Sequence, residues 1–419
     1  MSAPPPSEAG RVEPRGAKAA LVLAGGGARA AYQVGVLQAF KEILPDPKVN
    51  PFPIITGTSA GAVNAAALAV HAGDYGHAVD NLLDVWRNFE PRHVYRSDFA
   101  GVMANSARWL FSLFFGAFVR DRRISLLDNL PLAALLERRL EFDRIAGNIA
   151  SGALDAVAIT CSGYTSGQSV SFFEGAPHLE GWKRSQRVGI ASRIRVEHLM
   201  ASSAIPFLFP AYKLHREFFG DGSMRQIAPV SPALHLGADR IIVIGTARIR
   251  NDAPERTRGD LYPTLAQVAG HVMNSIFLDS LAVDIERLER INRTITAVPP
   301  EKLREMGLTL HHVDVLVMTP SEPLDAIAMK HVANLPAPIR FLMRSIGAMR
   351  RGGATLASYL LFEQGYCGEL IALGYHDAMK RRDEVEAFLG GAMCPVPGAF
   401  ARTVTFFAPA AAAPAPGAK

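Results

Sequence analysis

A serine flanked by two glycines lies between a predicted strand and a predicted helix, and this arrangement limits the fold more than any other feature. Residues 57–61 read Gly-Thr-Ser-Ala-Gly and follow the apolar run 51–55, with Thr56 between them. Helical spacing of apolar residues comes next, at Val63, Ala66, Ala67 and Val70. A strand, a sharp turn carrying Ser59 and a helix form a nucleophile elbow. The pattern predicts an α/β fold with Ser59 as an acyl-transfer nucleophile, and a plain packing turn is the alternative.

A second glycine-rich turn occurs earlier in the chain. Residues 19–24 read as a buried strand and lead into Gly-Gly-Gly-Ala-Arg at 25–29. The apolar residues that then mark one helix face are Ala30, Val34, Leu37, Phe40 and Leu44. Free backbone N–H groups at a helix N-terminus bind anions. The turn therefore predicts a site for a phosphate or for the oxyanion of a tetrahedral acyl intermediate.

The phosphate interpretation requires further signals that the chain lacks. Gly25, Gly27 and Ala30 fit the dinucleotide fingerprint, which also needs an acidic residue about 20 positions later at a strand end. Asp46 is the nearest candidate, but it lies in a proline-rich turn. No Gly-Lys-Ser/Thr follows the glycines either. The oxyanion interpretation is therefore favoured.

An aspartate between two glycines is the third candidate. Residues 218–223 read Phe-Phe-Gly-Asp-Gly-Ser, after Ala-Ser-Ser-Ala-Ile-Pro at 201–206. Asp-Gly alone is an ordinary turn signal. A carboxylate within hydrogen-bond reach of a serine hydroxyl can also act as a general base, and partial burial would raise its pKa toward the working pH.

These three motifs together, in this order, resemble those of patatin-like phospholipases of the bacterial type. The resemblance covers about residues 18–250. It implies hydrolysis of lipid acyl esters by a Ser–Asp dyad, Ser59 and Asp221, without a histidine and without a cofactor or metal. It also implies an oxyanion hole from Gly25, Gly26, Gly27, Ala28 and Arg29, with structural support from Gly57, Gly61 and Gly222. A solvated Arg29 side chain is the alternative for that residue.

The chain departs from the family pattern at two positions. The family usually has glycine where this chain has Ala30, and Gly or Ala where this chain has Ser223. Alanine is tolerated if residue 30 is already helical, and a serine at 223 could tune the aspartate by hydrogen bonding. Neither change removes a catalytic group.

Alternation of apolar strands and helical patterns predicts a three-layer α/β/α sandwich with a mostly parallel central sheet, patatin-like, plus C-terminal helices. The predicted strands are 20–24, 54–57, 154–160, 169–173, 240–245 and 314–318. The predicted helices are 30–44, 61–71, 132–141, 231–236 and 265–290, with further helix across 335–390. The predicted division is a disordered tail (1–17), a catalytic core (18–250), a part that packs on or caps it (251–395) and a low-complexity tail (396–419).

Two other functions remain open at this stage. One is an α/β-hydrolase esterase with a Ser-Asp-His triad. Its candidate histidines are His235, His271, His311, His312, His331 and His376. None has a catalytic neighbourhood, and the elbow comes too early in the chain for that fold. The other is a catalytically silent lipid-binding protein.

Composition predicts the partners and the compartment. The net charge of +5 over 419 residues is too small to indicate nucleic acid, although it modestly favours anionic lipid surfaces. Three cysteines give neither a disulfide framework nor metal spacing. No signal peptide or spanning segment is recognisable, so the expected location is cytoplasmic, with peripheral contact at a membrane.

The apolar run 109–119 is the candidate for that membrane contact. Its aromatic residues are Trp109, Phe111, Phe114, Phe115 and Phe118. The run is too short to span a bilayer. It predicts either a buried core helix or a lid that dips into the lipid that serves as substrate.

Overall fold

The computed structural model describes residues 17–96, 125–248, 264–276, 280–308, 310–345 and 354–390, together with a few single positions between these ranges. The tails predicted at 1–17 and 396–419 lie outside the described residues, except for Ala17. Of the aromatic run 109–119, only Phe111 is described, and it is 55% exposed. The lid and the core-helix interpretations of that run both stay predictions.

A mixed sheet forms the centre of the molecule. Five strands in the order β10-β9-β1-β2-β3 are all parallel. They are β1 (Ala19–Leu23), β2 (Ile54–Thr58), β3 (Ala156–Gly163), β9 (Arg240–Ile244) and β10 (Asp314–Met318). Parallel strands need helical crossovers, which the alternating pattern supplies. The carboxyl ends of β1 and β2 therefore lie side by side, and each continues into a glycine-flanked turn.

The sheet changes direction beyond β3. There β3 pairs antiparallel with β4 along most of its length, and its last three residues also pair antiparallel with β8. The remaining strands are β4 (Ser169–Gly175), β5 (Trp182–Arg184), β6 (Arg187–Ala191), β7 (Tyr212–Leu214) and β8 (Glu217–Asp221). This extension carries Asp221 back to the end of β3.

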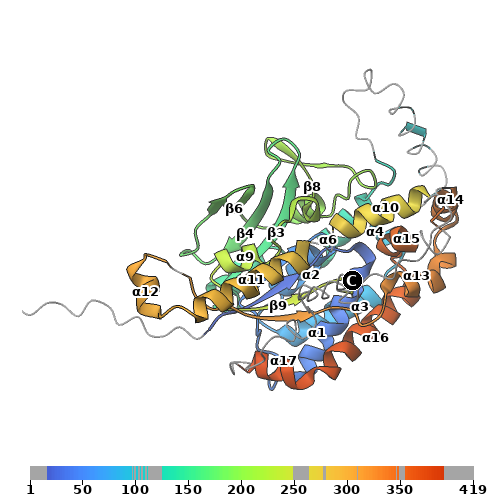
Figure 1. Ribbon diagram of the computed structural model, residues 1–419. Helices are drawn as coiled ribbons and strands as arrows, with labels where there is room; N and C mark the ends of the chain where they lie inside the picture. The colour runs from blue at the N-terminus through green and yellow to red at the C-terminus, as the bar shows by residue number, and fades with distance from the viewer. Residues whose placement is uncertain are drawn as a thin grey trace, which may run out of the picture.

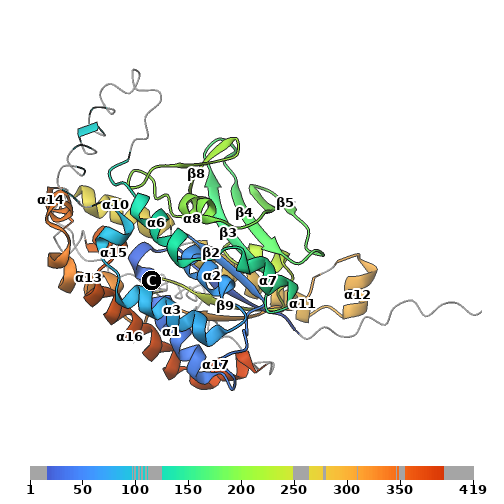
Figure 2. The same ribbon diagram turned by 180° about the vertical axis from the view of Figure 1, so that it is seen from behind.

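Helices cover both faces of the sheet, as the opposite views of Figures 1 and 2 show. Side chains of β1 alternate between the two layers: Leu21 and Leu23 join the larger hydrophobic cluster, with α1 (Ala31–Ile43), and Ala20 and Val22 join the smaller one, with α11 (Ser280–Thr296). The period of two is that of a strand buried on both faces. The predicted three-layer α/β/α architecture is confirmed.

The other helices near the site follow the predicted elbow and the later apolar runs. On the side of the larger cluster are α2 (Ala60–Val70), α3 (Tyr75–Arg87), α4 (Pro91–Val94), α6 (Leu130–Arg139), α7 (Arg144–Ala150) and α8 (Val196–Ser202). Short turns of 3₁₀-helix follow the two glycine motifs, η1 (Gly27–Ala30) and η3 (Gly222–Arg225). On the opposite side α9 (Ser231–His235) packs near α11.

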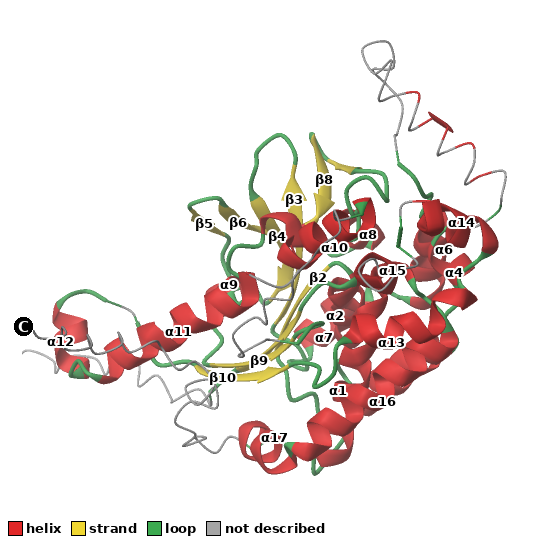
Figure 3. Cartoon of the chain, turned by 45° about the vertical axis from the view of Figure 1, so that its right-hand side comes forward, coloured by secondary structure: helices red, strands yellow, loops and turns green. Residues whose placement is uncertain are grey.

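The C-terminal helices are also present. They are α10 (Leu265–Asn274), α12 (Pro300–Glu305), α13 (Leu324–His331), η5 (Val332–Asn334), α14 (Ala337–Ser345), α15 (Ala354–Leu360), α16 (Gln364–Lys380) and α17 (Arg382–Leu389). Two of them bear directly on the site, because α15 contacts both η1 and α10 (Figure 3). None of the described helices is both long enough and apolar enough to cross a bilayer.

All six predicted strands are present, with ends shifted by up to three residues. Within the predicted helix 265–290 the described residues form α10 and α11, and residues 277–279 between them lie outside the described residues. The sequence analysis did not predict α3 or the short strands β5 to β8. The boundaries predicted for the core (18–250) and for the part that packs on it (251–395) stay a prediction.

Candidate active site

Ser59 occupies the sharp turn between β2 and α2. Its backbone has φ 55° and ψ −128°, a strained combination for a residue with a side chain. The Ser59 amide donates a hydrogen bond to Ser202 Oγ (2.8 Å), and Ser202 Oγ donates to the carbonyl oxygen of Thr160 (2.6 Å). This relay fixes the turn to β3. Ser59 is nearly buried, at 2% exposed, at the N-terminal end of α2.

Glycine at position 61 lets the elbow pack against the neighbouring strand. A Cβ at Gly61 would overlap the carbonyl oxygens of Leu23 and Ala24, which end β1. Gly57 lies within β2, paired with Ile159 of β3. The first turn of α2 therefore presses directly on the backbone that leads into the triple-glycine loop.

Strand register brings Asp221 to Ser59. Thr58 pairs with Thr160 in β3, and the next residue of β3, Cys161, pairs with Asp221 of β8. Ser59 and Asp221 thus flank the same point of β3, although 162 positions separate them in the chain. The Ser59 hydroxyl is close enough to Asp221 to lower the pKa of that carboxyl by hydrogen bonding.

Asp221 is a fully buried carboxyl with one satisfied oxygen. Its Oδ1 accepts a hydrogen bond from the Ser223 amide (2.9 Å), with Gly222 forming the turn between them. Among the described residues, no well-aligned hydrogen bond reaches Oδ2. Burial raises the pKa of Asp221 from 3.8 to about 6, against the smaller lowering effects of Ser59 and Ser223. At neutral pH such a group is an ionised base that accepts a proton readily.

The glycine loop lies next to the elbow and keeps its amides available. Thr246 Oγ donates to the carbonyl oxygen of Gly25 (2.5 Å), and Gly27 has φ 55°. A Cβ at Gly27 would overlap the carbonyl oxygen of Tyr359, so only glycine fits there. Within the described part of the chain, the amides of Gly25, Gly26, Gly27 and Ala28 donate to no backbone carbonyl. The Arg29 amide differs, because it donates to the carbonyl oxygen of Gly26 (3.2 Å).

Arg29 is buried, at 3% exposed, which rules out the alternative of a solvated side chain. Its Nε donates to Ser358 Oγ (2.7 Å) and its Nη1 to Tyr359 Oη (3.3 Å) and Asn274 Oδ1 (3.4 Å). The guanidinium also lies 4.2 Å from the centre of the Tyr359 ring. Arg29 therefore ties the glycine loop to α15 and α10.

A cavity of about 220 Å³ opens beside Ser59 and Gly27. Most of its wall is apolar, supplied by α2, α3 and α6, and examples are Val63, Ala67, Leu82, Val85, Leu132 and Leu136. Tyr359 and Phe362 line it from the C-terminal part. The shape suits an apolar chain whose reacting end lies at the serine.

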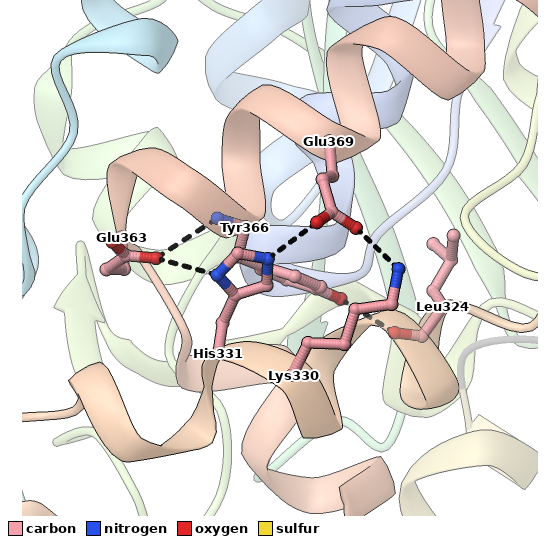
Figure 4. A network of polar contacts seen from close by, with 6 residues as sticks. All are labelled: Leu324, Lys330, His331, Glu363, Tyr366 and Glu369. Carbon is pink, nitrogen blue, oxygen red and sulfur yellow. Dashed lines mark hydrogen bonds and ion pairs between the residues drawn. The ribbon is translucent and has the colours of Figure 1, made fainter.

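Two of the histidines considered for a triad have other partners. His235 Nδ1 lies 2.8 Å from the carbonyl oxygen of Ser231, and its ring stacks on Trp182. His331 lies between two carboxylates, Glu363 and Glu369, at 3.6 and 3.0 Å (Figure 4). Among the described residues, no histidine forms a hydrogen bond or ion pair with Ser59 or Asp221.

Sequence reasoning missed the cavity wall and the partners of Arg29. The wall on α3 had a readable signal: Asp74 accepts from the His77 amide (2.9 Å) as an N-cap, and apolar residues follow at helical spacing. Ser358 and Tyr359 had none, because more than 300 positions separate them from Arg29. Only the folded chain brings them together.

Comparison with known proteins identifies related chains. Residues 21–234 match the family model described as patatin-like phospholipase. No curated protein matches the chain. Among solved structures, VipD from Legionella pneumophila is similar at 14% identity and a TM-score of 0.32, covering 88% of this chain and 67% of that one. A chain from the complex of SpcU with ExoU of Pseudomonas aeruginosa is similar at 19% identity and a TM-score of 0.20, covering 39% and 36%.

Proposed function

Since the chain belongs to the patatin-like phospholipase family, we propose that it hydrolyses fatty-acyl esters of lipids, with Ser59 as nucleophile and Asp221 as base. The observation that carries the proposal is the meeting of these two buried side chains at one point of β3. An unsatisfied carboxylate oxygen beside a serine in a strained turn has little structural use. It has a direct use as a proton acceptor.

The first half-reaction uses the serine, the aspartate and the loop amides. Ser59 Oγ attacks the ester carbonyl carbon while its proton passes to Asp221. The carbonyl oxygen becomes an oxyanion, which the amides of the loop 25–28 stabilise by hydrogen bonding. The carbon–oxygen bond to the leaving alcohol then breaks, and that alcohol takes the proton from Asp221. An acyl-Ser59 ester remains.

The second half-reaction reverses the proton path. Water attacks the acyl carbon, and Asp221 takes one of its protons. The carbon–Oγ bond breaks, Ser59 recovers its proton from Asp221, and the fatty acid leaves. Since the Arg29 amide is already engaged in η1, we assign the oxyanion donors to the amides that precede it and a holding role to the Arg29 side chain.

The apolar cavity supports a lipid as substrate. A chain buried against leucine, valine and aromatic side chains is stabilised by about 0.8 kcal/mol per methylene group. The proposal does not assign a head group. The peripheral membrane contact of residues 109–119 remains part of it, with Phe111 as the described member.

Replacing the nucleophile tests the proposal. Ser59→Ala is expected to lose labelling by a fluorophosphonate probe and to reduce hydrolysis of a soluble acyl ester roughly a thousandfold or more. Ser231→Ala is the matched control, because Ser231 is a buried serine on the opposite side of the sheet and hydrogen-bonds His235. It should keep both properties.

Two results would refute the proposal. Turnover that persists in Ser59→Ala would assign the chemistry to another group. A folded wild-type protein that binds vesicles but neither reacts with the probe nor hydrolyses any ester would be a lipid-binding protein that has lost catalysis.

A further inference from the structure

The cavity follows one face of α2 from end to end. Ser59, Val63, Ala67 and His71 all line it, and they are spaced by four residues. Residues four apart lie on the same face of an α-helix, one turn after another. The stripe therefore runs from the nucleophile at the N-terminal end of α2 to its C-cap, His71.

Opposite this stripe, the wall is apolar near the serine and polar at the far end. Trp86, Val85 and Leu82 contribute from α3, and Leu132 and Leu136 from α6. The far end adds His71, Asn81 and Arg139. A substrate that enters this cavity meets about three helical turns of apolar surface and then hydrogen-bonding and charged groups.

Two separate polar contacts lie at this end, one of them an exposed ion pair. Asn81 Nδ2 lies 3.4 Å from His71 Nε2, and Arg139 Nη1 lies 3.3 Å from Asp84 Oδ2. Burial lowers the pKa of His71, and the nearby Arg144 and His77 add to the effect. A methylene chain that reached these groups would displace hydrogen bonds and gain no apolar contact.

Helix geometry turns this arrangement into a length. Twelve residues separate Ser59 from His71, which corresponds to about 18 Å along the axis at 1.5 Å per residue. An extended hydrocarbon with tetrahedral angles advances by about 1.25 Å per carbon, so about 14 carbons fill that distance. By the same reasoning, Val63 lies at about 5 carbons and Ala67 at about 9 or 10.

We propose that the stripe of Val63, Ala67 and His71 measures the acyl chain, so that the protein prefers chains of about 12 to 16 carbons. The inference rests on the proposed function, because it takes Ser59 as the reacting end. The stripe itself plays no part in the chemical steps. Its members act by setting how deep a chain can lie before it meets a side chain.

A series of soluble esters with saturated acyl chains from 2 to 18 carbons tests this preference for chain length. Wild type should show its highest kcat/KM near 14 carbons. Val63→Phe should retain only the shortest chains, up to about 4 or 5 carbons, and Ala67→Phe should move the optimum to about 8 to 10 carbons.

Two further variants distinguish an effect of the stripe on chain-length preference from a folding defect. Ala134→Phe adds the same ring to an exposed position of α6 that does not line the cavity, and it should leave the length profile unchanged. His71→Leu extends the apolar surface without adding bulk near the serine. It should raise kcat/KM for 16 and 18 carbons about threefold relative to 14 carbons.

The results distinguish failure of the chain-length proposal from failure of the proposed function. One outcome is that wild type hydrolyses esters in a Ser59-dependent way while the length profiles of Ala67→Phe and His71→Leu match that of wild type. In that case the chain-length proposal is wrong and the proposed function is kept. If Ala67→Phe does not fold, the His71→Leu profile decides alone. If wild type hydrolyses no ester of any length, both fall together.

Discussion

At the residue scale, burial of the charged Asp221 carboxyl lowers the stability of the folded state. Its carboxyl is fully buried, and burial raises its pKa from 3.8 to about 6. For an acid, a raised pKa means that the folded state disfavours the charged form. Below the unfolded-state pKa both states are protonated and nothing is lost. As the pH rises through 6, the folded state carries the full cost, which is about 3 kcal/mol.

Asp221→Asn should therefore abolish hydrolysis and stabilise the protein at neutral pH. The neutral amide avoids the cost of burying a charge and can still accept the hydrogen bond from the Ser223 amide. The expected gain in the free energy of unfolding is up to about 3 kcal/mol above pH 6 and close to zero below pH 4. Urea unfolding at a series of pH values measures it. A difference between the two proteins that does not change with pH would contradict the assignment.

The sequence was sufficient to single out the residues proposed to react and insufficient to show their setting. Ser59 and Asp221 could be located because each lies beside glycines at a strand end, a local pattern. The burial of Asp221 and the unsatisfied Oδ2 depend on the pairing of β8 with β3, which no local pattern records. The same holds for Arg29, whose partners come from the other end of the chain.

At the scale of elements, η1 depends on a helix that lies outside the family segment. Residues 21–234 match the family model, whereas α15 is Ala354–Leu360. It supplies Ser358 and Tyr359 to Arg29, and Tyr359 Oη also donates to Asn274 of α10 (3.2 Å). The Arg29 side chain thus links the glycine loop to α15 and α10.

Arg29→Lys should weaken catalysis without weakening binding. Lysine keeps the charge, but it cannot donate to Ser358 and Tyr359 together or stack as a planar group. A less well-positioned oxyanion loop should lower kcat about tenfold or more while KM stays within twofold. Steady-state kinetics on one soluble ester measures both.

Arg290→Lys is the matched control for that prediction. Arg290 is an exposed arginine of α11 whose partner is Glu286 (3.5 Å), one turn away. Its replacement should leave both constants unchanged. A rise in KM with unchanged kcat in Arg29→Lys would instead place Arg29 in substrate binding.

Elements with a strong local pattern could be predicted, and those set by partners could not. The strand 314–318 was predicted with its observed ends because four apolar residues follow Asp314 without interruption. The strands β5 and β7 have three residues each, which is too short for an alternating pattern to stand out.

At the scale of the whole molecule, one core joins the family segment to the rest of the chain. The same hydrophobic cluster contains Leu37 and Phe40 of α1 together with Leu370 and Ile371 of α16. Polar bonds join the same two helices, since Tyr32 Oη donates to Asp377 (3.2 Å) and Tyr375 Oη to Glu42 (2.7 Å). The sheet continues as well, because β9 lies between β1 and β10.

Removing residues 249–419 should therefore abolish cooperative folding, whereas removing 396–419 should not. The shorter chain would lose β10, α16 and Tyr359, which leaves β9 as an open edge, the apolar face of α1 uncovered and Arg29 without its partners. We expect it to be insoluble or to unfold without a sharp transition, and to lose all ester hydrolysis. The chain ending at 395 should unfold in one urea transition with the same midpoint by tryptophan fluorescence and by circular dichroism. A soluble, active protein ending at 248 would show instead that the predicted core folds alone and that the C-terminal helices merely cover it.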